Sequence, residues 1–163
     1  ILVFSQAIPV FALAPVLTLW LGYGLISKVT MAVLIIYFPV TSAFFDGLRK
    51  TPSGLLDLAT VMQATELRTL FYLKIPAAMP SLLSGIRLAA VYATIGATIG
   101  EWVGSSEGLG YLMLLANGRV KTDLMFAALF TLGALSVSLY GLINILIRQF
   151  LLRYENPSGT GEL

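Results

Sequence analysis

Few residues in this chain could catalyse a reaction. Its 163 residues contain neither histidine nor cysteine, which excludes the common zinc sites and the nucleophiles that depend on cysteine or a serine–histidine pair. Lys50 and Thr51 form the pair that ends a phosphate-binding loop, but the glycines that such a loop needs before the lysine are absent. We therefore expect no catalytic residue, no metal site and no bound cofactor in this chain.

Two ionisable residues lie within or beside a long apolar stretch. Arg87 is the only charged residue in 79–100, and Glu101 follows directly. Arg87 lies close enough to the end of the stretch for its side chain to reach the surface. An ionisable residue in a membrane span is a functional candidate, so Glu101 is our main candidate for a gate or pathway residue; a solvated carboxylate is the alternative. Other residues that could line a pathway are Tyr92, Thr94 and Thr98, although threonine can also bond to its own helix.

The composition indicates a membrane protein. Hydrophobic residues make up 58% of the chain, charged residues 11%, and the mean hydropathy is +0.90. A soluble domain carries about 25% charged residues, so this chain lacks the polar surface that water would require. Its net charge is only +2, and the basic residues are dispersed, which argues against a nucleic-acid partner.

Four stretches without charge, or with Arg87 alone, are predicted to span the bilayer. They cover residues 8–25, 29–45, 79–100 and 124–147 of a single membrane domain at 1–153. The apolar patch within 101–123 is too short to span, so we expect an interfacial helix there. Residues 154–163 are predicted to form a disordered tail. Because the chain begins inside an apolar run, we expect further residues upstream.

A charged loop at residues 46–78 separates the second and third stretches. By the positive-inside rule its basic residues place it in the cytoplasm. Arg148 and Arg153 after the last stretch place the C-terminus on the same side. The basic residues of the loop are Arg49, Lys50, Arg68 and Lys74.

The loop is predicted to contain two short helices. Thr65 is a candidate N-cap for the second helix, with Glu66 in its first turn. Pro76 is expected to end that helix. The first helix is indicated by apolar residues at helical spacing, namely Leu55, Leu58, Ala59 and Met62.

The loop resembles one found in the permease subunits of bacterial ABC importers that work with a solute-binding protein. The segment 76–89 and the segment from Ile8 to Pro15 are also similar to this family, and the match extends to about Arg153. The residues that carry the resemblance in the loop are Asp57-x-Ala59-x-x-x-Gln63-Ala64, followed by Ile75-Pro76.

Two residues of the loop depart from the family pattern. Asp57 replaces a glutamate, which keeps the charge and shortens its reach. Gln63 replaces a glycine between the two helices. If the turn requires a positive φ, glutamine costs about 1–2 kcal/mol there.

The resemblance implies an all-α membrane protein, with four transmembrane helices of a six-helix permease fold. It also implies three partners in the inner membrane system: an ABC ATPase subunit that binds ATP and Mg²⁺, an extracytoplasmic solute-binding protein, and a second permease copy. The loop would be the ATPase-coupling loop, and its contact residues would be Asp57, Leu58, Ala59, Met62, Gln63, Ala64, Glu66, Leu67, Arg68 and Pro76.

The segment 100–112 is most similar to permeases for nitrate, sulfonates, taurine and thiamine-pyrimidine precursors, and we favour the pyrimidine precursors. An ion-coupled secondary transporter is the alternative, although only Arg87 and Glu101 come near its need for intramembrane charges. A membrane-embedded enzyme is a third possibility, but this chain lacks histidine, cysteine and a close pair of acidic residues for catalysis. The paired loop helices could also suggest DNA binding, but the adjacent spans argue against it.

Overall fold

The computed structural model describes residues 9–155, with side chains up to Leu151, and every element in this range is a helix. The expected all-α class is thus confirmed for the described residues. In chain order the elements are α2 (Val10–Leu21), α3 (Leu25–Arg49), α4 (Ser53–Val61), α5 (Glu66–Thr69), the π-helical turn η1 (Leu70–Lys74), α6 (Ile75–Gly104), α7 (Leu109–Gly118) and α8 (Thr122–Glu155).

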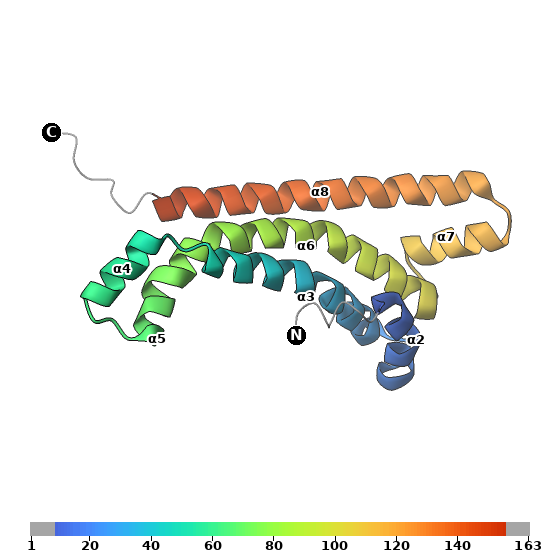
Figure 1. Cartoon of the computed structure of the whole chain (residues 1–163). Coiled ribbons are helices and arrows are strands. Elements are labelled where there is room, and N and C mark those ends of the chain that lie inside the picture. Colours follow the sequence, from blue (N-terminus) through green and yellow to red (C-terminus); the bar gives the residue numbers. More distant parts are fainter. Residues whose placement is uncertain (1–8, 156–163) are drawn as a thin grey trace.

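The long helices α3, α6 and α8 run side by side, and the short helices gather at the two ends (Figure 1). Helices α4 and α5 lie at one end, together with the C-terminal end of α8. Helices α2 and α7 lie at the opposite end. This arrangement agrees with the expected topology, in which the charged loop and the end of the last span face the same side of the membrane.

Three helices, not four, are long and apolar enough to cross a membrane within the described residues: Leu25–Arg49, Glu66–Gly104 and Thr122–Leu151. The span predicted at 8–25 is not confirmed. The described helix within it is the 12-residue α2, which ends at Leu21 and is followed by Gly22 with φ of +79°. At 1.5 Å per residue such a helix covers about 18 Å, less than the ~30 Å hydrocarbon core.

Helices α3 and α6 pack antiparallel at very short range because glycines lie at their contacts. A Cβ on Gly96 would lie 2.7 Å from the Cα of Ala32, and one on Gly85 would lie 2.9 Å from the Cβ of Ala43. Small residues let helix backbones approach closely in a membrane, where packing drives association. The contacts of this interface are Gly47 with Ser81, Ala43 with Gly85, Ala32 with Gly96, and Lys28 with Gly100.

Pro76 does not end the second loop helix, contrary to the prediction. Helix α5, the turn η1 and α6 form one continuous helix from Glu66 to Gly104. Proline lacks an N–H and its ring crowds the carbonyl four residues earlier. The wider π-helical turn directly before Pro76 accommodates both effects, and the N–H of Ile75 bonds to the carbonyl of Leu70 five residues back.

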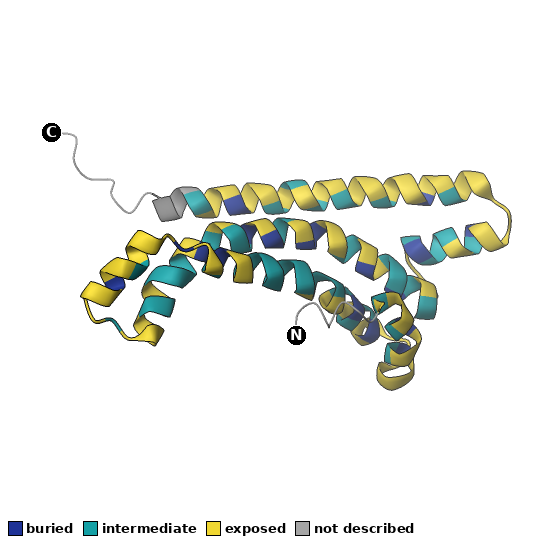
Figure 2. Ribbon diagram, in the orientation of Figure 1, coloured by how far each residue is buried: buried dark blue, intermediate teal, exposed yellow. Residues whose placement is uncertain are grey.

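Helix α8 is exposed along most of its described length (Figure 2), and many of its exposed residues are apolar. Ala128 and Ile147 are its buried contacts, whereas Phe130 and Val137 are exposed. An exposed apolar helix of this length is suited to lipid or to other apolar spans. The helix continues through Glu155, past the predicted start of a disordered tail at 154; residues 156–163 of that prediction lie outside the described residues.

Candidate functional site

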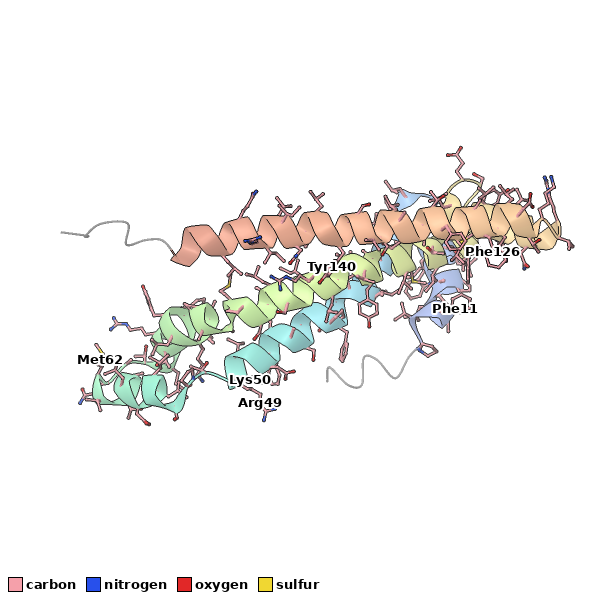
Figure 3. All side chains as sticks on the ribbon, turned by 90° about the horizontal axis from the view of Figure 1, so that it is seen from above. Phe11, Arg49, Lys50, Met62, Phe126 and Tyr140 are labelled. Carbon is pink, nitrogen blue, oxygen red and sulfur yellow. The ribbon has the colours of Figure 1, made fainter. Side chains whose placement is uncertain are left out.

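Helices α4 and α5 form a hairpin that projects beyond the ends of the long helices. Met62 lies at its tip, well separated from Arg49 and Lys50 at the end of α3 (Figure 3). Thr65 caps α5 as predicted, because its Oγ1 accepts the N–H of Arg68 at 3.4 Å. Thr51 lies just after the end of α3, and its hydroxyl donates to the carbonyl of Leu48 in that helix at 2.9 Å.

The turn between α4 and α5 requires the left-handed conformation that the family glycine would supply. Gln63 has φ of +51°. The N–H of Ala64 donates to the carbonyl of Ala59 at 2.9 Å, and the N–H of Gln63 donates to the carbonyl of Thr60 at 3.0 Å. These two bonds form a Schellman motif, in which the residue at the position of Gln63 is most often glycine. Gln63 is therefore strained, as the sequence suggested.

Replacing Gln63 by glycine is expected to stabilise the hairpin by about 1 kcal/mol. Glycine removes the strain of the left-handed conformation, although its larger loss of backbone entropy on folding offsets part of this gain. The thermal midpoint of the full-length permease in detergent should rise. Gln63→Ala is the matched control, because it keeps the Cβ and should give no rise. An unchanged midpoint for Gln63→Gly would show that the turn is not strained.

The hairpin exposes several large apolar side chains. Met62 is 72% exposed, and Leu58 and Leu67 are also exposed, whereas Ala59 is buried between the helices. Sequence reasoning missed the strongest members of this surface. The signal was present, because a large apolar residue in a charged loop is informative when it is exposed. The missed residues are Val61 (81% exposed), Phe71 and Tyr72 (78% exposed).

Charged residues border this apolar surface. Asp57 lies on α4, while Glu66 and Arg68 lie on α5, and all three are exposed. Two hollows flank the crossing of the helices: one of about 530 Å³ that includes Leu56, Glu66 and Lys74, and one of about 280 Å³ that includes Met62, Arg68 and Tyr72. Pro76 lies apart from this surface, within the continuous helix. The other predicted contact residues of the hairpin form an apolar patch with a charged rim. Protein interfaces usually have such an apolar centre and polar rim.

The candidate pathway residues divide between two faces of α6. Thr94, Thr98 and Glu101 share a pocket of about 290 Å³ with Leu109 of α7 and with leucines of α8. Tyr92 instead borders a separate pocket of about 520 Å³ that includes Asp46 and residues of α2 and α3. The Thr98 hydroxyl donates to the carbonyl of Thr94 at 2.9 Å, which is the bond to its own helix that the sequence left open.

Glu101 holds the start of α7 in place. Its Oε2 accepts the N–H of Gly110 at 2.6 Å. This N–H lies in the first turn of α7 and has no partner within the helix, and a carboxylate there is favoured by the helix dipole. Gly108 has φ of +117°, and a Cβ on it would overlap the Glu101 carboxylate. Glu101 therefore ties the end of α6 to α7 where α7 closes one end of the pocket.

Glu101→Leu is expected to release the first turn of α7. Loss of a hydrogen bond to a charged group costs about 1.5–3 kcal/mol, so exchange of the Gly110 amide should accelerate roughly 10- to 100-fold if exchange occurs by local opening. Hydrogen-exchange mass spectrometry of the full-length permease would measure this change. Glu107→Leu, at an exposed carboxylate nearby, should leave the Gly110 amide unaffected; equal acceleration in both variants would contradict the tie.

The comparisons agree with the geometry. A family model described as "Binding-protein-dependent transport system inner membrane component" matches residues 1–152. A probable ABC transporter permease protein of Haemophilus influenzae is 58% identical over 93% of this chain and 62% of its own length. A formylaminopyrimidine transport permease protein of Halalkalibacterium halodurans is 42% identical over 84% of this chain and 55% of its own length.

A riboflavin transport system permease protein of Chloroflexus aurantiacus is 41% identical over 95% of this chain and 58% of its own length. The chain thus spans between about half and two thirds of the length of these relatives. The resemblance stated from the loop sequence is confirmed. The chain belongs to the family of binding-protein-dependent transport system inner membrane components.

Proposed function

We propose that the full-length protein is the translocating subunit of an ATP-driven importer, and that the α4–α5 hairpin docks into a separate ATPase subunit. The observation that carries this proposal is the hairpin's exposed apolar surface, centred on Val61 and Met62 and bordered by Asp57 and Arg68. Such a surface is suited to filling a groove on a partner. ATP and Mg²⁺ would bind to that partner, and this chain would be non-catalytic.

The continuous helix from Glu66 to Gly104 offers a direct route from the hairpin to the pathway. Its first turns belong to the docking surface, and its last turns carry Thr94, Thr98 and Glu101 beside the 290 Å³ pocket. A displacement of the hairpin by the ATPase would therefore move the pocket wall as part of the same helix. We propose that this movement alternates access to the two sides of the membrane.

The proposed orientation places the hairpin and the end of α8 in the cytoplasm. The exposed basic residues Arg49, Lys50 and Arg68 lie at this end, as does Arg148 on α8. This distribution follows the positive-inside rule. The opposite end, with α2 and α7, would face an extracytoplasmic solute-binding protein, and a second copy of the permease would complete the pathway as a homodimer.

A heteroaromatic solute is the proposed cargo, with a thiamine-pyrimidine precursor favoured. Two relatives above 40% identity are named for formylaminopyrimidine and for riboflavin, both of them nitrogen heterocycles. Sulfonates, taurine and nitrate are the next candidates. Uptake of labelled formylaminopyrimidine and taurine by cells that express the complete transporter would separate these classes, and transport of taurine alone would contradict the favoured cargo.

Asp57→Lys tests the docking proposal. The full-length permease is purified in detergent with its candidate ATPase, and both the ATPase yield and the stimulated hydrolysis are measured. A positive charge at residue 57 should be repelled by the part of the ATPase surface that is complementary to aspartate. Both the ATPase yield and the stimulated hydrolysis should therefore fall at least tenfold. Asp123→Lys, at an exposed aspartate of α8 on the opposite end, is the matched control. Retention of the ATPase by Asp57→Lys with full stimulation would overturn the proposal.

A further inference from the structure

Helix α6 has two faces of opposite character. Gly85, Gly96 and Gly100 contact α3. At 3.6 residues per turn, Arg87 lies about 160–220° away from all three. The same calculation places Thr94, Thr98 and Glu101 within about 40° of Arg87 around the axis. Arg87 therefore shares the face of α6 whose threonines and glutamate border the pocket beside α8.

Arg87 is the only charged residue in the apolar part of α6. In the antiparallel register, the charge-free stretch 29–45 of α3 lies against residues 83–99 of α6. This overlap places Arg87 about 6 Å inside the end of that stretch, at 1.5 Å per residue. A guanidinium has five N–H donors, which need hydrogen-bond partners of their own.

One donor of that guanidinium has no protein partner. The Nε of Arg87 is buried, and it bonds to no atom of the described residues. A buried donor without a partner costs about 1–3 kcal/mol, and more when the group is charged. Such groups are rare in folded proteins and indicate a missing partner. The arginine fork suits a planar pair of acceptor atoms better than a single one.

We propose that Arg87 is a solute-recognition residue on the inner part of the pathway, and that it binds a planar pair of hydrogen-bond acceptors on the transported molecule. The pair could be two oxygens of a sulfonate or carboxylate, or the nitrogen and oxygen edge of a heteroaromatic ring. Arg87 lies two turns from Thr94 on the same face of α6, about 10 Å away at 1.5 Å per residue. This inference rests on the proposed import function and adds the chemistry that the pathway selects.

The test exploits the absence of cysteine from these 163 residues. Thr94→Cys serves as a reporter in the full-length permease, with any cysteine outside this range replaced by serine. The probes are two methanethiosulfonates of similar size, one carrying a sulfonate and one a quaternary ammonium. With Arg87 present, the sulfonate reagent should react at least tenfold faster than the ammonium reagent. Val137→Cys, on an exposed position of α8, should react slowly with both.

Arg87→Leu in the Thr94→Cys background should abolish the preference for the sulfonate reagent. Arg148→Leu removes the same charge from an exposed position and should keep the preference. Arg87→Lys retains the charge without the planar fork, so it should keep the preference but lose protection by solute. If Arg87→Leu preserves the preference, Arg87 does not face the pathway and the inference fails.

Competition then identifies the source of the acceptor pair. Slower modification of Thr94→Cys by formylaminopyrimidine assigns the pair to a heteroaromatic edge, and slower modification by taurine assigns it to a sulfonate. Slowing by neither compound overturns recognition of a solute at Arg87. Co-purification of the ATPase is measured on the same samples, so a failed recognition site can be distinguished from a failed transporter assignment.

Discussion

Met62→Asp is expected to release the ATPase from the full-length permease almost completely. Met62 is 72% exposed at the tip of the hairpin, where docking would bury it in an apolar groove. A carboxylate buried there without a partner costs about 3–5 kcal/mol. Each 1.4 kcal/mol is a factor of ten in affinity, so the dissociation constant should rise by roughly 100- to 4,000-fold, as measured by titration of the purified ATPase.

Asn117→Asp is the control for this prediction. It introduces the same carboxylate at an exposed position of α7, at the end of the molecule opposite the hairpin. Its affinity for the ATPase should equal that of the wild type. Unchanged affinity in Met62→Asp would exclude the apolar tip from the docking surface, even if Asp57→Lys weakened the complex.

Gly96→Leu is expected to prevent α3 and α6 from packing. Even a Cβ at this position would lie 2.7 Å from the Cα of Ala32 and 3.3 Å from its Cβ. The nearest of these atoms is backbone, so it cannot move aside as a flexible side chain would. Overpacking a core by extra methylenes costs about 1–3 kcal/mol, and a leucine against backbone should cost at least the upper value. The purified variant should aggregate or melt well below the wild type.

Gly133→Leu provides the matched control. This glycine lies in α8, and a Cβ there would meet no atom of the described residues within 4 Å. Leucine also has the higher helix propensity, so the thermal midpoint should stay the same or rise. Similar damage from both substitutions would refute the proposed role of the glycine contacts, because it would show that bulk anywhere on these helices is harmful.

The parts of the fold that were predictable from sequence are those with local causes. The stretches without charge, or with Arg87 alone, predicted the three long helices, and Thr65 predicted the start of α5, because capping depends on neighbouring residues alone. The strain at Gln63 was also foreseen, since a glycine in the family pattern indicates a conformation that glutamine tolerates poorly.

The error at Pro76 concerns a feature that depends on more than the residue itself. The sequence predicts that Pro76 ends a helix. The wider π-helical turn η1 makes room for the proline ring, so the helix continues from Glu66 to Gly104. The span predicted at 8–25 stays unconfirmed, since the described helix there, α2, ends at Leu21 before a glycine with positive φ.

Tertiary arrangement also determined which site residues belong together. Tyr92 was grouped with Thr94 in the sequence, yet two positions along a helix turn the side chain about 200°, and the two residues border different pockets. Glu101 was recognised as important, but its bond to the N–H of Gly110 depends on how α7 folds back. Val61 and Tyr72 were missed because exposure, rather than residue type, makes them candidates.

Disulfide cross-linking would test the docking surface most directly. Val61 and Val120 are 81% and 84% exposed and lie at opposite ends of the molecule, so Val61→Cys and Val120→Cys form a matched pair in a cysteine-free full-length permease. Each is mixed with the ATPase, which carries single cysteines around its groove, and oxidised. We expect a cross-link to the ATPase from Val61→Cys alone. A cross-link from Val120→Cys, or none from Val61→Cys in a complex that still hydrolyses ATP on stimulation, would contradict the account.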